Sequence, residues 1–248
     1  MKRLISMYLY RFVRSISIWV CLSFSFLIVL LPSLSRFIIT TPDSTPFSAA
    51  ESLLSAASSG FPMMLCGIGL AIFFHADEKN GYIKNIMPLL SSPAALIGAR
   101  LVISAVMALA MYLLIYVQLV LVSLLIFRGY ISFTAAQFGA FWVAFLLTAA
   151  FLSLITLLTI LSRGTSLPIV CDVICCTGLI SLLCFLINML INRFTPFHEF
   201  NLSQYIASGC LLALEDTGTH LREIIVAVCY LLVTSAAGIL TLRHRDTR

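Results

Sequence analysis

The side chains that could do chemistry gather in one short stretch, His75 to Pro93, which reads HADEKNGYIKNIMPLLSSP. Asp77 and Glu78 stand near its start, and Lys84 follows in its middle. Acids stabilise the N-terminal end of a helix and bases stabilise its C-terminal end, because they oppose the charges of the helix dipole. This order of charges therefore favours a short helix in an otherwise apolar part of the chain.

Apolar residues of the same stretch recur at helical spacing and form one face. They are Ile83, Ile86, Met87 and Leu90. Pro88 limits or kinks such a helix, while Ser92 and Pro93 suit the start of the next one. A plain connection needs only a few polar residues. The sequence therefore predicts an amphipathic coupling helix over about 77–92 that meets a soluble partner; the alternative is an interfacial helix without a partner.

Asp172 is an isolated acid within another apolar run. Near the start of a predicted span it would be stabilised by the helix dipole, reach toward the membrane surface, or pair with Arg163. Contact with a second copy of the chain, a part in coupling, and proton relay are the alternatives. Thr177 and Ser181 are four residues apart, a spacing of small residues that suits close approach of two helices.

The remaining polar groups indicate no enzyme. The four histidines fall at span ends or in loops, and no glycine is followed by lysine, so the chain has no recognisable phosphate-binding loop. We predict no catalytic residue, cofactor or metal in this chain. Polar residues within the spans, such as Gln118, Thr148 and Ser153, are expected to make contacts between helices.

The elements that must position these residues are membrane helices. Of the 248 residues, 61% are hydrophobic and 10% charged, which excludes an ordinary soluble domain. Long runs without charge exclude the alternating strands of a membrane barrel. Six spans of about 20 residues fit the sequence. They are about 16–38, 59–74, 95–127, 134–161, 167–191 and 224–242.

Charge asymmetry predicts the orientation. With both termini in the cytoplasm, the inner segments hold eleven of the 15 Lys and Arg residues, in agreement with the positive-inside rule. The net charge of +5 then reflects topology and does not indicate nucleic-acid binding. The sequence predicts a multi-pass protein of the plasma membrane.

Three segments flank these spans within a single domain of residues 1–248. Residues 1–15 are expected to form an interfacial amphipathic helix, with Tyr8 and Phe12 on its apolar face and Arg11 and Arg14 on its basic face. Residues 192–223 form an extracellular segment whose apolar middle is expected to dip toward the membrane, the alternative being an ordered external cap. Residues 243–248 form a cytoplasmic tail.

One part of the chain resembles a known family. EKNGYIKNI, followed by SSP and GARL, is similar to the first cytoplasmic loop of ABC-2 type permeases. In that loop an acidic residue, a glycine, an apolar stretch, a proline and a basic residue recur in this order. The matching positions are Glu78, Gly81, Ile83 to Leu90, Pro93 and Arg100. The predicted layout of spans agrees with the family over nearly the whole chain.

The resemblance implies a half-size permease subunit that pairs with a second permease, most simply an identical copy, and with two ATP-binding subunits that hold ATP and magnesium. The residues expected to contact the ATPase are Asp77, Glu78, Lys79, Asn80, Gly81, Ile83 and Lys84. Chain length, short outer loops and apolar spans make it similar to bacterial permeases that export amphipathic peptides, such as phenol-soluble modulin exporters and lantibiotic immunity permeases. Hydrophobic drugs or lipids are alternative cargoes. An ion-coupled secondary transporter or a noncatalytic membrane assembly protein is the alternative class.

Overall fold

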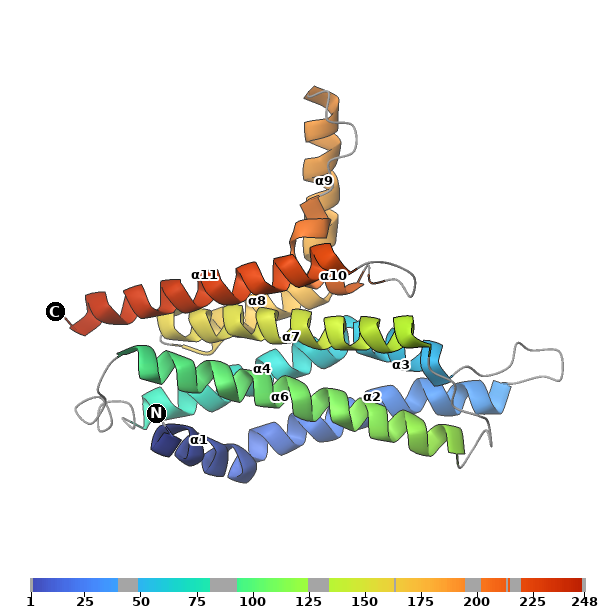
Figure 1. Cartoon of the computed structure of the whole chain (residues 1–248), viewed down its shortest axis with the longest axis horizontal. Coiled ribbons are helices and arrows are strands. Elements are labelled where there is room, and N and C mark those ends of the chain that lie inside the picture. Colours follow the sequence, from blue (N-terminus) through green and yellow to red (C-terminus); the bar gives the residue numbers. More distant parts are fainter. Residues whose placement is uncertain are drawn as a thin grey trace.

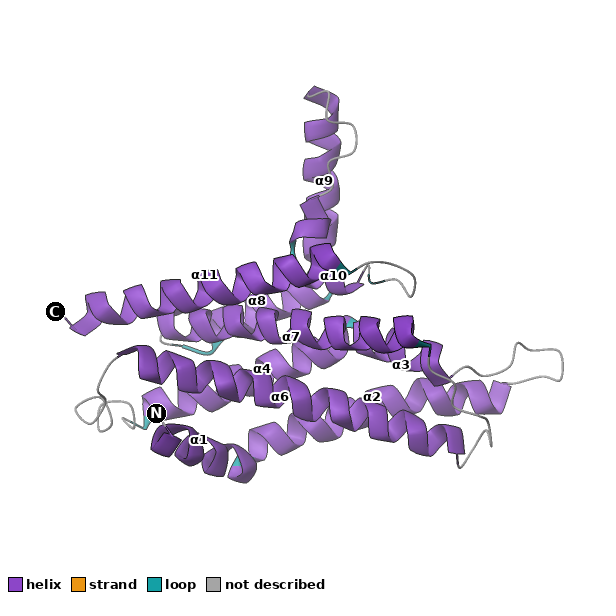
Figure 2. Cartoon of the chain, in the orientation of Figure 1, coloured by secondary structure: helices purple, strands orange, loops and turns teal. Residues whose placement is uncertain are grey.

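A computed structural model describes residues 2–39, 49–80, 93–124, 134–162, 164–194, 202–212, 214 and 220–246. Within these ranges every regular element is a helix (Figure 2). Four of the helices are long and apolar enough to cross a membrane, and up to six spans result if each of two bent helix pairs counts as one. The predicted all-α class is therefore confirmed, with four to six candidate spans.

The described residues form ten α-helices and one 3-10 helix. Their bounds are α1 Lys2–Arg14, α2 Ile16–Ile39, α3 Ala49–Ser58, α4 Gly60–Lys79, α6 Pro93–Val122, α7 Ala135–Ser162, α8 Ser166–Cys176, α9 Leu179–Phe194, the 3-10 helix η3 Leu202–Tyr205, α10 Ala207–Leu212 and α11 Leu221–Asp246. The four candidate spans are Gly60–Asp77, Ala94–Val122, Ala135–Ser162 and Leu221–Leu242. The bent pairs are α1 with α2 and α8 with α9.

Helix α7 is the centre of the bundle. It packs against α3, α4, α6, α8, α10 and α11, and its sequence contains no charged residue. A helix that is apolar on all sides is stable where other helices surround it. Figure 1 shows α2, α4, α6, α7 and α11 running roughly side by side, with both chain termini at the same end.

Polar side chains within the bundle join neighbouring helices, as the sequence predicts. The Tyr112 hydroxyl on α6 lies 2.8 Å from the Thr148 hydroxyl on α7. Ser153 on α7 makes a similar contact of 2.8 Å with Thr234 on α11. The Gln118 side-chain amide donates to the backbone carbonyl of Phe26 on α2, at 2.7 Å. In an apolar medium these hydrogen bonds satisfy groups that would otherwise be costly to bury.

The N-terminal helix exists but packs differently from the prediction. Tyr8 and Phe12, expected to enter the membrane surface, are buried in the protein, with ring centroids 6.5 and 6.2 Å from that of Phe73 on α4. The helix is bent from α2 by 59°, and the Trp19 indole donates to the Val13 carbonyl across the bend at 2.7 Å. The apolar face of α1 therefore meets α4 and α6 instead of lipid, because those helices offer it a protein surface.

The predicted start of the coupling helix is wrong. Helix α4 continues without a break through Asp77 to Lys79, and the Asn80 N–H donates to the Ala76 carbonyl at 3.1 Å. Asp77 therefore belongs to the end of the second span and does not begin a new element. Acidic residues favour the start of a helix, but here the apolar run of α4 extends the helix past Asp77, which is paired with Arg11. The rest of the predicted coupling helix, 81–92, lies outside the described residues.

The predicted fifth span is two helices. Helix α8 ends at Cys176 and α9 begins at Leu179, with 65° between them. Gly178 occupies the turn with φ of 79°, a left-handed conformation that glycine adopts without a steric penalty. Figure 1 shows α9 leaving the bundle at a steep angle to the other long helices. Helix α3 is a separate helix before α4 and was also not predicted from the sequence.

Candidate functional site

Charged side chains are buried together where α1, α4 and α6 meet. Arg11 Nη2 forms an ion pair with Asp77 Oδ1, and the Asp77 side chain is fully enclosed. Arg100 is only 1% exposed, and its guanidinium lies 5.0 Å from the centroid of the Phe74 ring, within the range of a cation–π contact. Tyr8 lies within electrostatic reach of all three charges. We call these five residues the Asp77 cluster.

Helical spacing explains how the cluster assembles. Phe74 and Asp77 are three residues apart on α4 and share one face of that helix. Tyr8 and Arg11 are also three residues apart on α1, and the Arg11 side chain pairs with Asp77, so the expected placement of Arg11 on a basic face away from Tyr8 is wrong. Arg100 lies near the beginning of α6. The Asp77 carboxylate compensates buried positive charge that the apolar surroundings would otherwise disfavour.

The Asp77 cluster contains residues on both sides of the segment 81–92 in the sequence. Asp77 precedes this segment by one helical turn, and Arg100 follows it by two turns. Both side chains pack at α1.

The predicted ATPase-contact residues have different environments. Asp77 is enclosed and cannot face a partner, which corrects the assignment made from the sequence. Lys79 and Asn80 are exposed at the end of α4. The Glu78 side chain, together with Gly81, Ile83 and Lys84, lies outside the described part of the chain. The surface available to a partner thus begins at Lys79.

From the sequence, Arg11 belongs to the N-terminal helix and Asp77 to the coupling helix, and no ion pair between them was predicted. The available signal was Arg100, a lone charge within an apolar run, since such a residue usually needs a partner inside the membrane. The position of the partner depends on how α1 folds back on the bundle, and no local pattern encodes it.

Asp172 also lies elsewhere than predicted. It is fully buried on α8 against α4, so its side chain is not exposed at the surface of the single chain. Arg163, its predicted partner, is outside the described residues. Thr177 is in the turn before α9 and Ser181 is within α9, so the two do not form a small-residue face on one helix. The shared helix face of Thr177 and Ser181 is therefore wrong, while a dimer or coupling contact of these residues stays a prediction.

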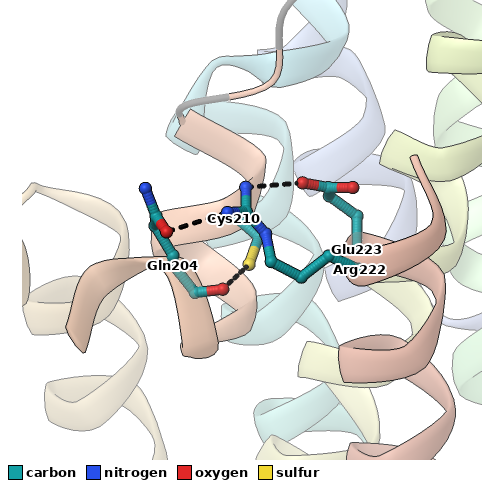
Figure 3. A network of polar contacts seen from close by, with 4 residues as sticks. All are labelled: Gln204, Cys210, Arg222 and Glu223. Atoms are coloured by element: carbon teal, nitrogen blue, oxygen red, sulfur yellow. Dashed lines mark hydrogen bonds and ion pairs between the residues drawn. The ribbon is translucent and has the colours of Figure 1, made fainter. Parts of the chain in front are cut away.

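A second polar network joins the short helices of the 192–223 segment to α11 (Figure 3). Arg222 donates from Nη1 to Gln204 Oε1 and from Nη2 to Glu223 Oε1, both at 2.8 Å. The Cys210 thiol donates to the Gln204 carbonyl at 2.9 Å, and burial raises the pKa of this thiol, which keeps its proton available. The described part of this segment contains the short helices η3 and α10.

Replacing Arg222 with Ala should loosen this network without unfolding the bundle. The Arg222 side chain is 49% exposed, so its ion pair contributes only ~0.2–1 kcal/mol. Amide exchange in 202–212 should become up to roughly fivefold faster, since 1 kcal/mol corresponds to about that factor. Ser235→Ala is the matched control, because the Ser235 hydroxyl bonds only within its own exposed turn. Equal exchange in the two variants would contradict a role of Arg222 in holding η3 and α10.

A metal site was not found among the described residues. None of them form a group of three or more His, Cys, Asp or Glu side chains that could hold a metal ion. The chain matches no protein-family model, and no curated protein sequence matches it.

Proposed function

We propose that this chain is the permease subunit of an ATP-driven exporter of the ABC-2 type. The observation that carries the proposal is the Asp77 cluster. It joins the N-terminal helix to the two helices that flank residues 81–92, and this stretch contains the loop motif that resembles ABC-2 permeases. A transporter driven by a separate ATPase needs such a rigid connection between its cytoplasmic loop and its membrane helices.

In this proposal the chain has six spans, with the two bent pairs counted as spans one and five. Both termini lie in the cytoplasm of a bacterial cell. Two permease copies act with two ATP-binding subunits, which supply ATP and magnesium. The cargo class is amphipathic peptides, supported by the apolar character of the helices; hydrophobic drugs or lipids are the alternative cargo.

An ion-coupled secondary transporter is the second candidate. The fully buried Asp172 favours it, because acids within membrane helices are costly and commonly serve ion or proton movement. Co-purification with an ATPase distinguishes the two classes.

The test is to co-express the chain with the ATPase encoded beside its gene and to purify the complex through a tag on the chain. Lys79→Glu should lower ATPase recovery roughly tenfold, equivalent to about 1.4 kcal/mol of binding free energy. Lys79 is exposed, so its replacement should leave the melting temperature of the chain unchanged. The loss follows from reversing a charge at the start of the proposed docking surface.

Two controls accompany this experiment. Lys79→Arg keeps the charge and should keep the ATPase. Ala136→Glu places the same new carboxylate on an exposed position at the start of α7, at the end of the bundle away from the N-terminus (Figure 1). If Lys79→Glu and Ala136→Glu retain the ATPase equally, or if the wild-type chain never recovers it, the proposal is wrong.

A further inference from the structure

The Asp172 carboxyl group is enclosed between α8 and α4. Its Oδ1 accepts a hydrogen bond from the Cys176 thiol at 3.4 Å, and Oδ2 is buried without a hydrogen-bond partner. Gly67 of α4 lies directly against it: a Cβ at that position would stand 2.3 Å from Asp172 Oδ2. The contact between the two helices is therefore too close to admit water beside the carboxyl group.

The surroundings of Asp172 contain no compensating charge. Helix α8 packs against α4, α7 and α9. The titratable groups that face Asp172 are thiols: Cys66 on α4, Cys176 and Cys175 on α8, and Cys21 on α2. Helix α7 has no titratable residue, and α9 contributes only Cys184 among its described side chains. Among the described residues no Lys, Arg or His lies within ion-pair distance of Asp172.

An ionised carboxylate at this place would be desolvated and uncompensated. Burying an isolated charge in an apolar medium is so costly that the group takes up a proton instead. A neutral carboxylic acid can remain in the close contact with Gly67, whereas a carboxylate would require water or separation of the helices. The contrast with Asp77 is direct, since Asp77 is equally enclosed but faces Arg11.

We propose that Asp172 is a proton-binding site in the interior of the bundle, occupied at neutral pH, and that loss of its proton opens the contact between α8 and α4. The folded chain then binds one more proton here than the unfolded chain does. Its stability must therefore fall as the pH rises above about 4, the usual pKa of an Asp carboxyl in an unfolded chain, and must stop falling once the folded chain has also lost the proton. This inference does not depend on the proposed function, because it concerns the chain with or without an ATPase.

The first experiment is infrared spectroscopy of the full chain in lipid nanodiscs. At neutral pH the wild type should show the C=O stretch of a protonated carboxyl group, and Asp172→Asn should lack this band. Glu223→Gln is the matched control, because Glu223 is also largely buried but is paired with Arg222. That variant should keep the band. A wild type without the band at neutral pH overturns the proposal whether or not the Asn variant folds, as does a band that survives in Asp172→Asn.

The second experiment measures the melting temperature of the same samples from mildly acidic to alkaline pH. The wild type should lose stability with rising pH for as long as it keeps the carboxyl band, whereas Asp172→Asn, which has no proton to lose there, should be less sensitive to pH. Parallel melting curves for the two proteins would overturn the proposed opening of the contact. An intact complex with the ATPase in the Asn variant would leave the proposed function untouched, so the two proposals fail independently.

Discussion

Replacing Asp77 with Ala is expected to lower the free energy of unfolding by about 3–5 kcal/mol, the usual cost of removing one partner from a buried ion pair. The Asp77 side chain is fully enclosed, and its loss would leave the Arg11 guanidinium, which is 28% exposed, without this ion-pair partner. The measurement is the melting temperature and folded yield of the chain in detergent. Lys79→Ala is the matched control, since Lys79 is exposed two residues farther along the same helix.

A double-mutant cycle separates the ion pair from general damage to α4. The combined Arg11→Ala and Asp77→Ala variant should be less destabilised than the sum of the two single variants, because it removes the pair as a unit. Additive effects, or an Asp77→Ala protein as stable as Lys79→Ala, would contradict the assignment of Asp77 to a buried ion pair. The result would also weaken the proposed function, for which this cluster carries the argument.

Gly60→Ala is expected to destabilise the chain by about 1–3 kcal/mol, the usual range for adding a group to a filled core. A Cβ on Gly60 would stand 2.3 Å from the backbone carbonyl oxygen of Cys176, at the end of α8. That oxygen belongs to the main chain just before the Gly178 turn and cannot rotate away as a side chain would. The melting temperature of the purified chain is the measurement.

Gly139→Ala provides the opposite case. Gly139 is in α7, and a Cβ there would meet nothing within 4 Å. Alanine is the better helix former, so this change should stabilise the chain by up to about 1 kcal/mol. Stabilisation of the chain by both Gly60→Ala and Gly139→Ala would contradict the close approach of α4 and α8 at Gly60.

The two glycine sites also show what could be predicted from the sequence. Gly60 and Gly139 lie within helices, whereas Gly178 lies in the turn where the chain changes direction between α8 and α9. The residue type permits all these conformations, so the sequence pattern alone treated 167–191 as one span. Whether a glycine bends the chain depends on what packs beside it.

The same limit applies to the candidate site. The sequence places Lys79 and Asn80 in the coupling helix, after a second span that ends at about residue 74, whereas α4 continues through Lys79. The isolated charges Asp172 and Arg100 are visible as exceptions in apolar runs. Their partners were not visible, because Arg11 and Asp77 meet only after α1 has folded back onto α4. Periodicity describes one helix at a time and contains no information about which faces meet.

The sequence by itself determined that the described chain is helical, and it located the three long helices α6, α7 and α11. Apolar runs of this length form helices because each backbone group finds its hydrogen bond within the same segment. The tertiary structure decided which charges are enclosed, that α1 packs on protein, and that α8 and α9 diverge at Gly178. These features depend on contacts between segments that are distant in the chain, and only packing establishes such contacts.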